Sequence, residues 1–161
     1  MRALFFILFS TFLLVACKKD QPNNPNSWVS ISKRVQYQFD KDFIIVKSGE
    51  LETKIKKSKL PLKSAIILNS SLTGYFSELN LEHNIVGVSS PEYIFSDKIQ
   101  NLVSEKQIAD VGNEQKFDLE KILSLKPDVI FANYVPNFQN TYDVLAQNGI
   151  KIIFLDEYLE R

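Results

Sequence analysis

The chain after Pro61 repeats one pattern, a short apolar run followed by a stretch with helical spacing. The apolar runs cover residues 65–68, 85–88, 129–132 and 150–155. Short runs rich in Ile and Val are typical of strands that are buried on both faces. Strands that alternate with helices pair in parallel through right-handed crossovers. The pattern therefore predicts an α/β fold, with a Rossmann-like parallel sheet and flanking helices.

The segments between these runs carry the signals of helices. Apolar side chains recur at i, i+3, i+4 and i+7 after Ser70 and Ser71, either of which can cap the first helix. Asp118 is a suitable cap for another helix, and Asn148-Gly149 can end the last one. The region 89–115 is less regular, with a short extended piece at 109–111. We expect helices over residues 72–79, 97–103, 118–125 and 138–147.

The part of the chain before Pro61 has a different spacing of apolar residues. Apolar and polar residues alternate over 35–39, and a polar turn at 40–42 leads into a second apolar run at 43–46. Period-two alternation around a short turn predicts a β-hairpin, and residues 51–55 can add a third strand. This strand carries part of a lysine run. The run is consistent with an anion-binding patch, but we favour a solvated edge strand. Its members are Lys54, Lys56, Lys57 and Lys59.

The N-terminus is short, positively charged and then apolar. Arg2 precedes an apolar stretch over 3–16, which is the length of a signal peptide and is shorter than the ~20 residues of a spanning helix. The sequence that ends in Cys17 resembles a bacterial lipoprotein signal, in which the cysteine is lipidated and becomes the first residue after cleavage. A free or buried thiol is the alternative. Residues 1–16 are thus expected to be a signal peptide, and the polar residues 17–32 a flexible tether.

Composition excludes several classes of function. Lys plus Arg equals Asp plus Glu, at 19 each, so the net charge offers no general attraction for nucleic acid. One Cys and one His give neither a disulfide framework nor a zinc site, and we expect no intrinsic cofactor or metal. The five glycines are scattered, so no phosphate-binding glycine loop is present. His83 precedes the second apolar run, away from the predicted site, and we expect no enzymatic activity.

In an open parallel sheet, ligands bind beyond the carboxyl ends of the strands. This rule selects the loops 69–73, 89–93, 133–137 and 156–158, together with the turn at 111–113. The loops carry hydroxyl, amide and phenol groups, which can orient a bulky and partly apolar ligand. The alternative is that these residues are ordinary caps and turns.

Four segments in order resemble the periplasmic binding proteins for iron-siderophores, haem and vitamin B12. They are 65–81, 84–89 ("NIVGVS"), 109–112 and 118–130 ("DLEKILSLKPDVI"), and the resemblance extends over residues 33–161. It implies a two-lobed protein of which this chain is the N-terminal lobe. It also implies ligand contacts from the loops selected above, at Ser71, Ser90, Glu92, Tyr93, Asn113, Asn133 and Tyr134.

The resemblance also implies partners. Glu120 matches an acid that docks on the permease, although a carboxylate at a helix start also interacts favourably with the helix dipole. The expected protein is a monomeric solute-binding component of an ABC transporter, held in the bacterial cell envelope by its lipid and facing the periplasm. It would capture a ferric siderophore, haem or cobalamin and deliver it to the permease and its ATPase.

The chain departs from the resemblance in two ways. The loop after residue 88 lacks the Tyr-Pro-Pro element of cobalamin binders, so the identity of the ligand does not carry over. Arg161 lies just beyond the fourth main strand, where relatives continue into a connecting helix and second lobe, so we expect a truncated protein. The alternative function is a lipid-anchored scaffold or sensory protein that uses the same lobe to bind another protein.

Overall fold

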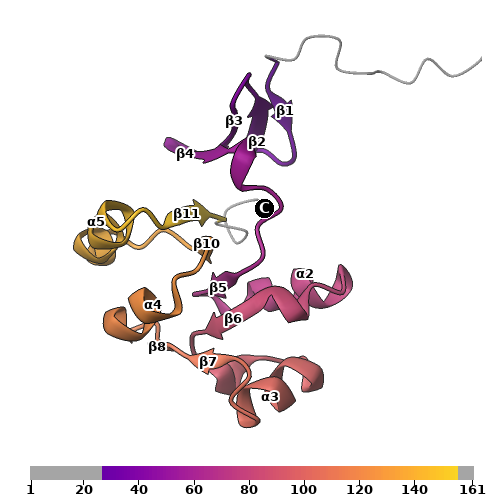
Figure 1. The fold of residues 1–161 in the computed structure, drawn as a ribbon, viewed down its shortest axis with the longest axis vertical. Coiled ribbons are helices and arrows are strands. Elements are labelled where there is room, and N and C mark those ends of the chain that lie inside the picture. Colours follow the sequence, from indigo (N-terminus) through magenta and orange to yellow (C-terminus); the bar gives the residue numbers. More distant parts are fainter. Residues whose placement is uncertain (1–26, 156–161) are drawn as a thin grey trace, which may run out of the picture.

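The computed structural model describes residues 27–155, and it begins with a four-stranded antiparallel sheet in the order β1-β2-β3-β4 (Figure 1). The predicted hairpin and third strand are present. A further strand, β1, lies within the range 17–32, so the expected tether ends before it. The strands are β1 (Val29–Ser30), β2 (Val35–Phe39), β3 (Phe43–Ser48) and β4 (Leu51–Lys56). The expected signal peptide, Cys17 and the loop 156–158 lie outside the described residues.

The second part is a five-stranded parallel sheet in the order β11-β10-β5-β6-β7. Each of the four predicted apolar runs contains a strand, and the extended piece at 109–111 supplies the edge strand β7. The Rossmann-like parallel sheet is thus confirmed. Its strands are β5 (Ala65–Ile67), β6 (Ile85–Val88), β7 (Ala109–Asp110), β10 (Val129–Ala132) and β11 (Lys151–Phe154).

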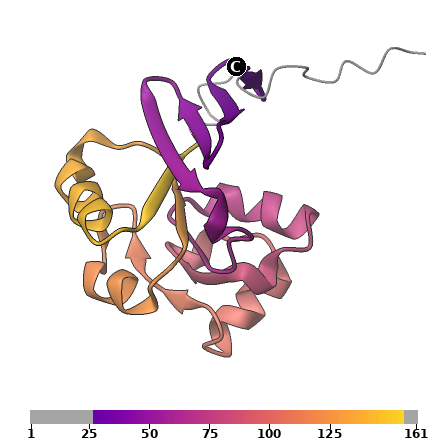
Figure 2. The same cartoon turned by 45° about the horizontal axis from the view of Figure 1, so that its top comes forward.

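Helices connect the strands and cover both faces of the parallel sheet (Figures 1 and 2). All four predicted helices form, with ends that differ from the expected ones by a few residues. They are α2 (Thr73–Glu78), α3 (Asp97–Ser104), α4 (Leu119–Leu125) and α5 (Gln139–Gln147). Between β7 and α4 a small hairpin forms from β8 (Gly112–Asn113) and β9 (Lys116–Phe117), which the sequence pattern did not predict. In the described part of the chain, none of the helices is both long and apolar enough to span a membrane.

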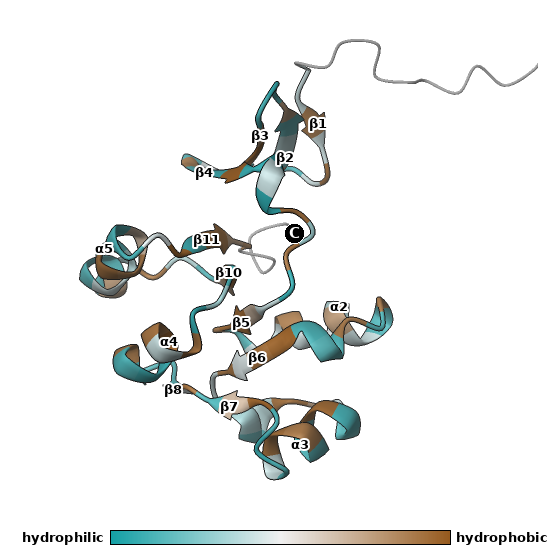
Figure 3. Cartoon of the chain, in the orientation of Figure 1, coloured by the Kyte–Doolittle hydropathy of each residue, from teal (hydrophilic) through white to brown (hydrophobic). Residues whose placement is uncertain are grey.

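The core lies in two layers because neighbouring strand residues point to opposite faces. Ile66 packs with Ile122 of α4 and Leu145 of α5, whereas Ile67 packs with Leu72 and Ile99 on the side of α2 and α3. All six side chains are almost completely buried. In Figure 3 the strand β11 is coloured hydrophobic, and α4 and α5 carry both hydrophobic and hydrophilic colours, as expected of helices with one face on a core.

The antiparallel sheet packs on the β11 end of the parallel sheet. Its register places Ile44 opposite Ile55, and Ile55 is buried against Ala65, Val129 and Ile153. The Thr53 hydroxyl donates a hydrogen bond to the carbonyl of Ile152, at 2.5 Å. Figure 2 shows the β3–β4 hairpin next to β11. As predicted, β4 is an outer strand with exposed lysines.

Candidate functional site

The order of the parallel strands defines one point where ligands are expected to bind. From β5 the chain continues to β6 and β7 on one side of the sheet, and then crosses back to β10 and β11 on the other. The loops after β5 and β10 therefore leave the sheet in opposite directions, and a ligand crevice is expected at their carboxyl ends. Backbone hydrogen bonds from Leu68 to Phe131 and from Ser89 to Ile67 extend the sheet to this edge.

The loop after β5 is organised by Asn69. Its Oδ1 atom accepts hydrogen bonds from the Ser71 backbone N–H at 2.9 Å and from the Ser71 hydroxyl at 2.8 Å. The predicted caps were therefore wrong: Asn69 caps the turn before α2, while the Ser70 carbonyl accepts a bond from the Thr73 hydroxyl. The side chain of Asn69, one residue before Ser70, thus reaches the Ser71 N–H group at the start of this turn. Ser71 itself is exposed on the loop.

The loop after β10 is held by a tyrosine of α5. The Tyr142 hydroxyl donates to the carbonyl of Asn133 at 3.2 Å and accepts from the N–H of Val135 at 3.3 Å. Tyr134 lies between these residues, half-buried, with its ring 5.4 Å from that of Phe154 and its hydroxyl 2.9 Å from Gln139 Oε1. Asn133 and Tyr134 are thus fixed beside the crevice, across from Ser71.

The loop after β6 turns sharply at Ser90. This residue has a φ of 47° and its N–H bonds to the Gly112 carbonyl at 2.8 Å, which ties the loop to β8. Ser90 is only 2% exposed, so its side chain has little surface to offer a ligand. Glu92 is exposed, and Tyr93 is 65% exposed. Within this predicted loop the accessible groups are therefore the carboxylate and the phenol.

Asn113 belongs to the small hairpin after β7. Its Oδ1 accepts from the N–H groups of Gln115 at 3.0 Å and Lys116 at 3.1 Å, and this closes the β8–β9 turn. All seven predicted ligand contacts thus lie on loops at the carboxyl edge of the sheet. Ser71, Asn133 and Tyr134 flank the crevice, whereas Glu92, Tyr93 and Asn113 lie on the loops of the adjoining strands β6 and β7.

Two features of this edge were not predicted. Phe95 follows the β6 loop and is fully exposed, at 100% of its surface. Behind Tyr134, a contiguous group of aromatic rings joins α5, β9 and β11; it consists of Phe117, Phe138, Tyr142 and Phe154. The aromatic residues were visible in the sequence. The contact between their rings was not visible in the sequence, because the residues come from separate elements of the fold.

Glu120 lies in the first turn of α4. The predicted cap is confirmed, since Asp118 Oδ1 accepts from the N–H of Lys121 at 3.0 Å. In the chain, α4 comes after β7 and the small hairpin. Its first turn therefore lies near the carboxyl edge of the sheet, as the ligand loops do. Glu120 is exposed, and within the described residues its carboxylate makes no hydrogen bond or ion pair. It is therefore available to a partner.

The carboxylates with a clearly altered pKa lie away from this edge. The pKa of Glu82 is lowered by a hydrogen bond from its own backbone and by Lys98, whose Nζ lies 3.0 Å from Glu82 Oε1. The pKa of Asp128 is lowered by the Lys63 N–H and then by Ser64. These residues precede β6 and β10, at the amino edge. Within residues 27–155, no group of three His, Cys, Asp or Glu side chains could hold a metal ion.

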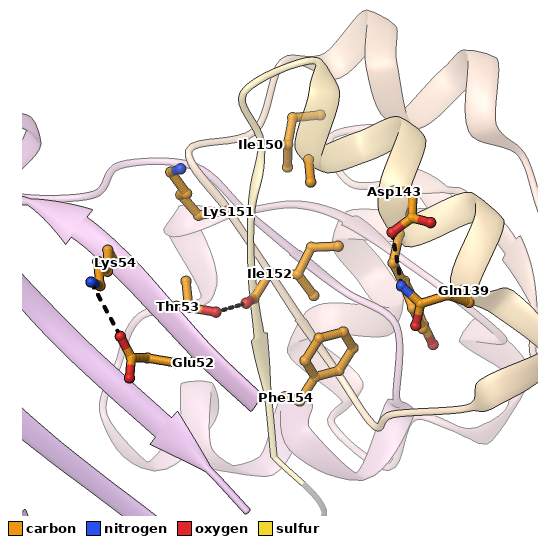
Figure 4. Close-up of a pocket in the computed structure, with 11 residues that line it drawn as sticks. Glu52, Thr53, Lys54, Gln139, Asp143, Ile150, Lys151, Ile152 and Phe154 are labelled. Atoms are coloured by element: carbon orange, nitrogen blue, oxygen red, sulfur yellow. Dashed lines mark hydrogen bonds and ion pairs between the residues drawn. The ribbon is translucent and has the colours of Figure 1, made fainter. Parts of the chain in front are cut away.

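A pocket of about 250 Å³ lies between β4, β11 and α5 (Figure 4). Several of its polar groups are paired with one another. Lys54 Nζ lies 3.4 Å from Glu52 Oε1, and Gln139 Nε2 donates to Asp143 Oδ1 at 2.8 Å. Because these groups already have partners, we do not assign a ligand to this pocket.

The chain forms an open parallel sheet, and the carboxyl edge of this sheet carries hydroxyl, amide and phenol groups. These features are typical of the class of ligand-binding α/β domains. The sequence profile of the periplasmic binding protein family matches residues 66–157. This chain therefore belongs to that family. No curated protein sequence is similar enough to the chain to count as a match.

Solved structures share the fold. The petrobactin-binding protein YclQ from Bacillus subtilis is 21% identical, with a TM-score of 0.54 over 71% of this chain and 38% of that one. The iron-uptake substrate-binding protein PiuA from Streptococcus pneumoniae is 20% identical, with a TM-score of 0.53 over 70% of this chain and 36% of that one. Staphylococcus aureus SirA, complexed with staphyloferrin B, is 29% identical, with a TM-score of 0.50 over 65% and 34%.

The chain thus spans little more than a third of the length of these structures. The family match at residues 66–157 covers most of the parallel sheet and its helices, and the fold class predicted from the sequence is confirmed. The family is one of binding proteins.

Proposed function

We propose that this chain is the N-terminal lobe of a solute-binding protein that delivers its ligand to an ABC permease and ATPase. The observation that carries the proposal is the switch in strand order between β5 and β10, whose loops carry Ser71 on one side and Asn133 and Tyr134 on the other. Membership of the periplasmic binding protein family supports it. The likeness to SirA, which binds staphyloferrin B, supports a metal chelate as the ligand. The proposed ligands are ferric siderophores, haem and corrinoids.

The exposed groups at the carboxyl edge suit a large ligand with both polar and apolar surface. Tyr93 and Phe95 offer aromatic faces, and Ser71 and Asn113 offer groups that donate and accept hydrogen bonds. The proposed role of Ser90 is different, because its burial leaves the backbone turn as its contribution. A second lobe would supply the opposite wall.

We also propose how the lobe is held in the cell envelope. Lipidation of Cys17 would attach the chain to a membrane, and with two or more acyl chains the attachment is stable. Nine residues lie between Cys17 and Ser27, the first described residue. An extended segment of this length reaches roughly 35 Å. The domain would therefore stay close to the membrane that carries its lipid.

The proposal is tested by ligand binding to the natural full-length gene product. Ferric siderophores, haem and corrinoids are titrated in turn, and binding is measured by quenching of intrinsic fluorescence. For the chelate that binds, Tyr93→Ala should weaken the affinity roughly 3- to 10-fold, the typical contribution of an aromatic contact. Leu79→Ala is the matched control, since Leu79 is 66% exposed at the far end of α2.

Two outcomes would count against the proposal. If none of the chelates binds, the lipid-anchored scaffold becomes the better hypothesis. If Tyr93→Ala and Leu79→Ala weaken binding equally, the ligand does not bind at the carboxyl edge.

A further inference from the structure

A recess of about 380 Å³ lies at the amino edge of the parallel sheet, opposite the candidate ligand site. Among its lining residues are Leu62, Asp128 and Gly149, which precede the strands β5, β10 and β11. The strand β4 of the antiparallel sheet forms another wall. The recess is therefore built where the two sheets meet.

Four lysines from three elements line this recess. Lys54 and Lys56 come from β4 and point to the same face because they alternate along the strand. Lys59 follows in the next turn, and Lys151 comes from β11, far away in the sequence. Three lysines of the run noted in the sequence thus line the recess, and Lys151 joins them only through the fold.

These positive charges are poorly compensated. Within the described residues, Lys56, Lys59 and Lys151 form no ion pair, and Lys54 is paired with Glu52 across 3.4 Å at the exposed surface. Like charges that line one recess repel each other, which an anion would relieve.

Asp128 is the one carboxylate among the described residues that line the recess. Its Oδ2 atom accepts hydrogen bonds from the Lys63 N–H at 2.8 Å and from the Ser64 N–H and hydroxyl, both at 3.1 Å. This oxygen is thus occupied by the backbone that leads into β5. One aspartate cannot neutralise four lysines.

The floor of the recess is apolar. Phe43, which pairs with Lys56 in the sheet register, and Leu62 are half-buried there. Charges that lie over an apolar surface are screened less than charges that are surrounded by water. Lysine ammonium groups above an apolar floor suit an anionic group that is attached to a less polar part of a molecule.

We propose that this recess binds a phosphate group, carried either by a membrane lipid headgroup or by a soluble molecule. Lysine ammonium groups bind phosphate as point charges, without the fixed geometry of arginine. The proposal does not depend on the solute that binds at the carboxyl edge, because the two sites lie at opposite ends of the strands.

The test compares two double variants of the full chain. Lys59→Gln with Lys151→Gln removes two charges from the recess. Lys33→Gln with Lys106→Gln removes two exposed charges elsewhere and is the matched control. Inorganic phosphate is titrated while backbone amide signals are followed by NMR. Sedimentation with phosphatidylglycerol vesicles, and with phosphatidylcholine vesicles as the neutral control, measures headgroup binding. The amide spectrum of each variant reports whether it is folded.

We expect phosphate to shift amide signals at 54–59, 128 and 151, and the recess variant to lose this response. If the source is a lipid, the recess variant should also bind phosphatidylglycerol vesicles roughly 30-fold more weakly, from the contribution of two lysines near a charged surface. A response to phosphate without a difference on vesicles assigns a soluble phosphate. Absence of any recess response to phosphate or to vesicles, or equal losses in both double variants, would overturn the proposal.

Discussion

Asp128 connects two strands of the parallel sheet through one side chain. Besides the three bonds that its Oδ2 accepts from Lys63 and Ser64, its own N–H donates to the Ser64 hydroxyl at 3.0 Å. These bonds fix the start of β5 beside the start of β10. At the scale of single residues, the aspartate in the "KPDVI" segment therefore has a structural role that its sequence position alone did not reveal.

Replacing this aspartate should destabilise the protein in a pH-dependent way. Because the pKa of Asp128 is lowered below its usual 3.8, the ionised side chain stabilises the fold above about pH 4, and the stabilisation is lost as the pH falls through the folded-state pKa. Asp128→Ala should lower the free energy of unfolding by about 1–2 kcal/mol at pH 7, since the side chain is exposed. Urea unfolding at pH 7 and pH 3 measures this.

Asp42→Ala is the control for Asp128→Ala, because Asp42 is exposed and its carboxylate has no bond within the described residues. The difference between the wild-type protein and Asp128→Ala should shrink at pH 3. A difference that stays constant with pH would show that the charge of Asp128 is not what matters.

Gly87 lies in the middle of β6 where no side chain fits. A Cβ atom there would lie 2.9 Å from Val111 Cγ1, 3.2 Å from Ile66 and 3.3 Å from Leu125. Gly87→Ala should lower the free energy of unfolding by about 1–3 kcal/mol through overpacking. Gly74→Ala is the control: nothing lies within 4 Å of its Cβ position, so in α2 alanine should stabilise the protein by about 0.5–1 kcal/mol. Thermal unfolding measures both changes. If the two variants are both stabilised or both destabilised relative to the wild-type protein, this account is contradicted.

At the scale of elements, the helix α5 determines the shape of the loop that follows β10. Its residue Tyr142 is 4% exposed and bonds to two backbone groups of that loop, and its ring lies 5.0 Å from that of Phe154. Asn133 and Val135 lie beyond Ala132, the last residue of β10. The conformation of the loop therefore depends on a side chain from the next helix.

Removing the Tyr142 hydroxyl should loosen this loop. Tyr142→Phe keeps the ring packing but leaves the Asn133 carbonyl and the Val135 N–H without their partner, at a cost of about 1–3 kcal/mol in the free energy of unfolding. Amide hydrogen exchange should be faster at Val135 than in the wild-type protein. Tyr37→Phe, in the antiparallel sheet, is the control and should leave exchange at residue 135 unchanged. Unaltered exchange at Val135 in Tyr142→Phe would refute the role of the hydroxyl.

At the scale of the whole molecule, the two ends of the parallel strands differ in character. The carboxyl edge presents hydroxyl, amide and aromatic groups with the exposed acids Glu92 and Glu120. The amino edge presents the lysine-lined recess. These exposed acids and the lysines of the recess thus lie at opposite ends of the strands, although the net charge of the chain is zero.

This separation leads to a prediction for Glu120. In the natural full-length protein, Glu120→Ala should reduce ligand uptake by cells while the affinity for the ligand stays unchanged, because the side chain is exposed in the first turn of α4 and makes no bond within the described residues. Uptake of the labelled chelate and its binding by the purified protein are both measured. Glu78→Ala, an exposed acid of α2, is the control. Equal losses of uptake and affinity in Glu120→Ala would argue against docking.

The sequence by itself determined the alternation of strands and helices, the parallel sheet and the loops at its carboxyl edge. These features follow from local periodicity and from the rule that parallel strands share their carboxyl ends. The cap at Asn69 was missed because neighbouring polar side chains compete for the same N–H groups, and their geometry decides. The burial of Ser90, the aromatic group behind Tyr134 and the addition of Lys151 to the lysine run were decided by the tertiary structure alone. Each depends on contacts between segments far apart in the chain, which no local pattern records.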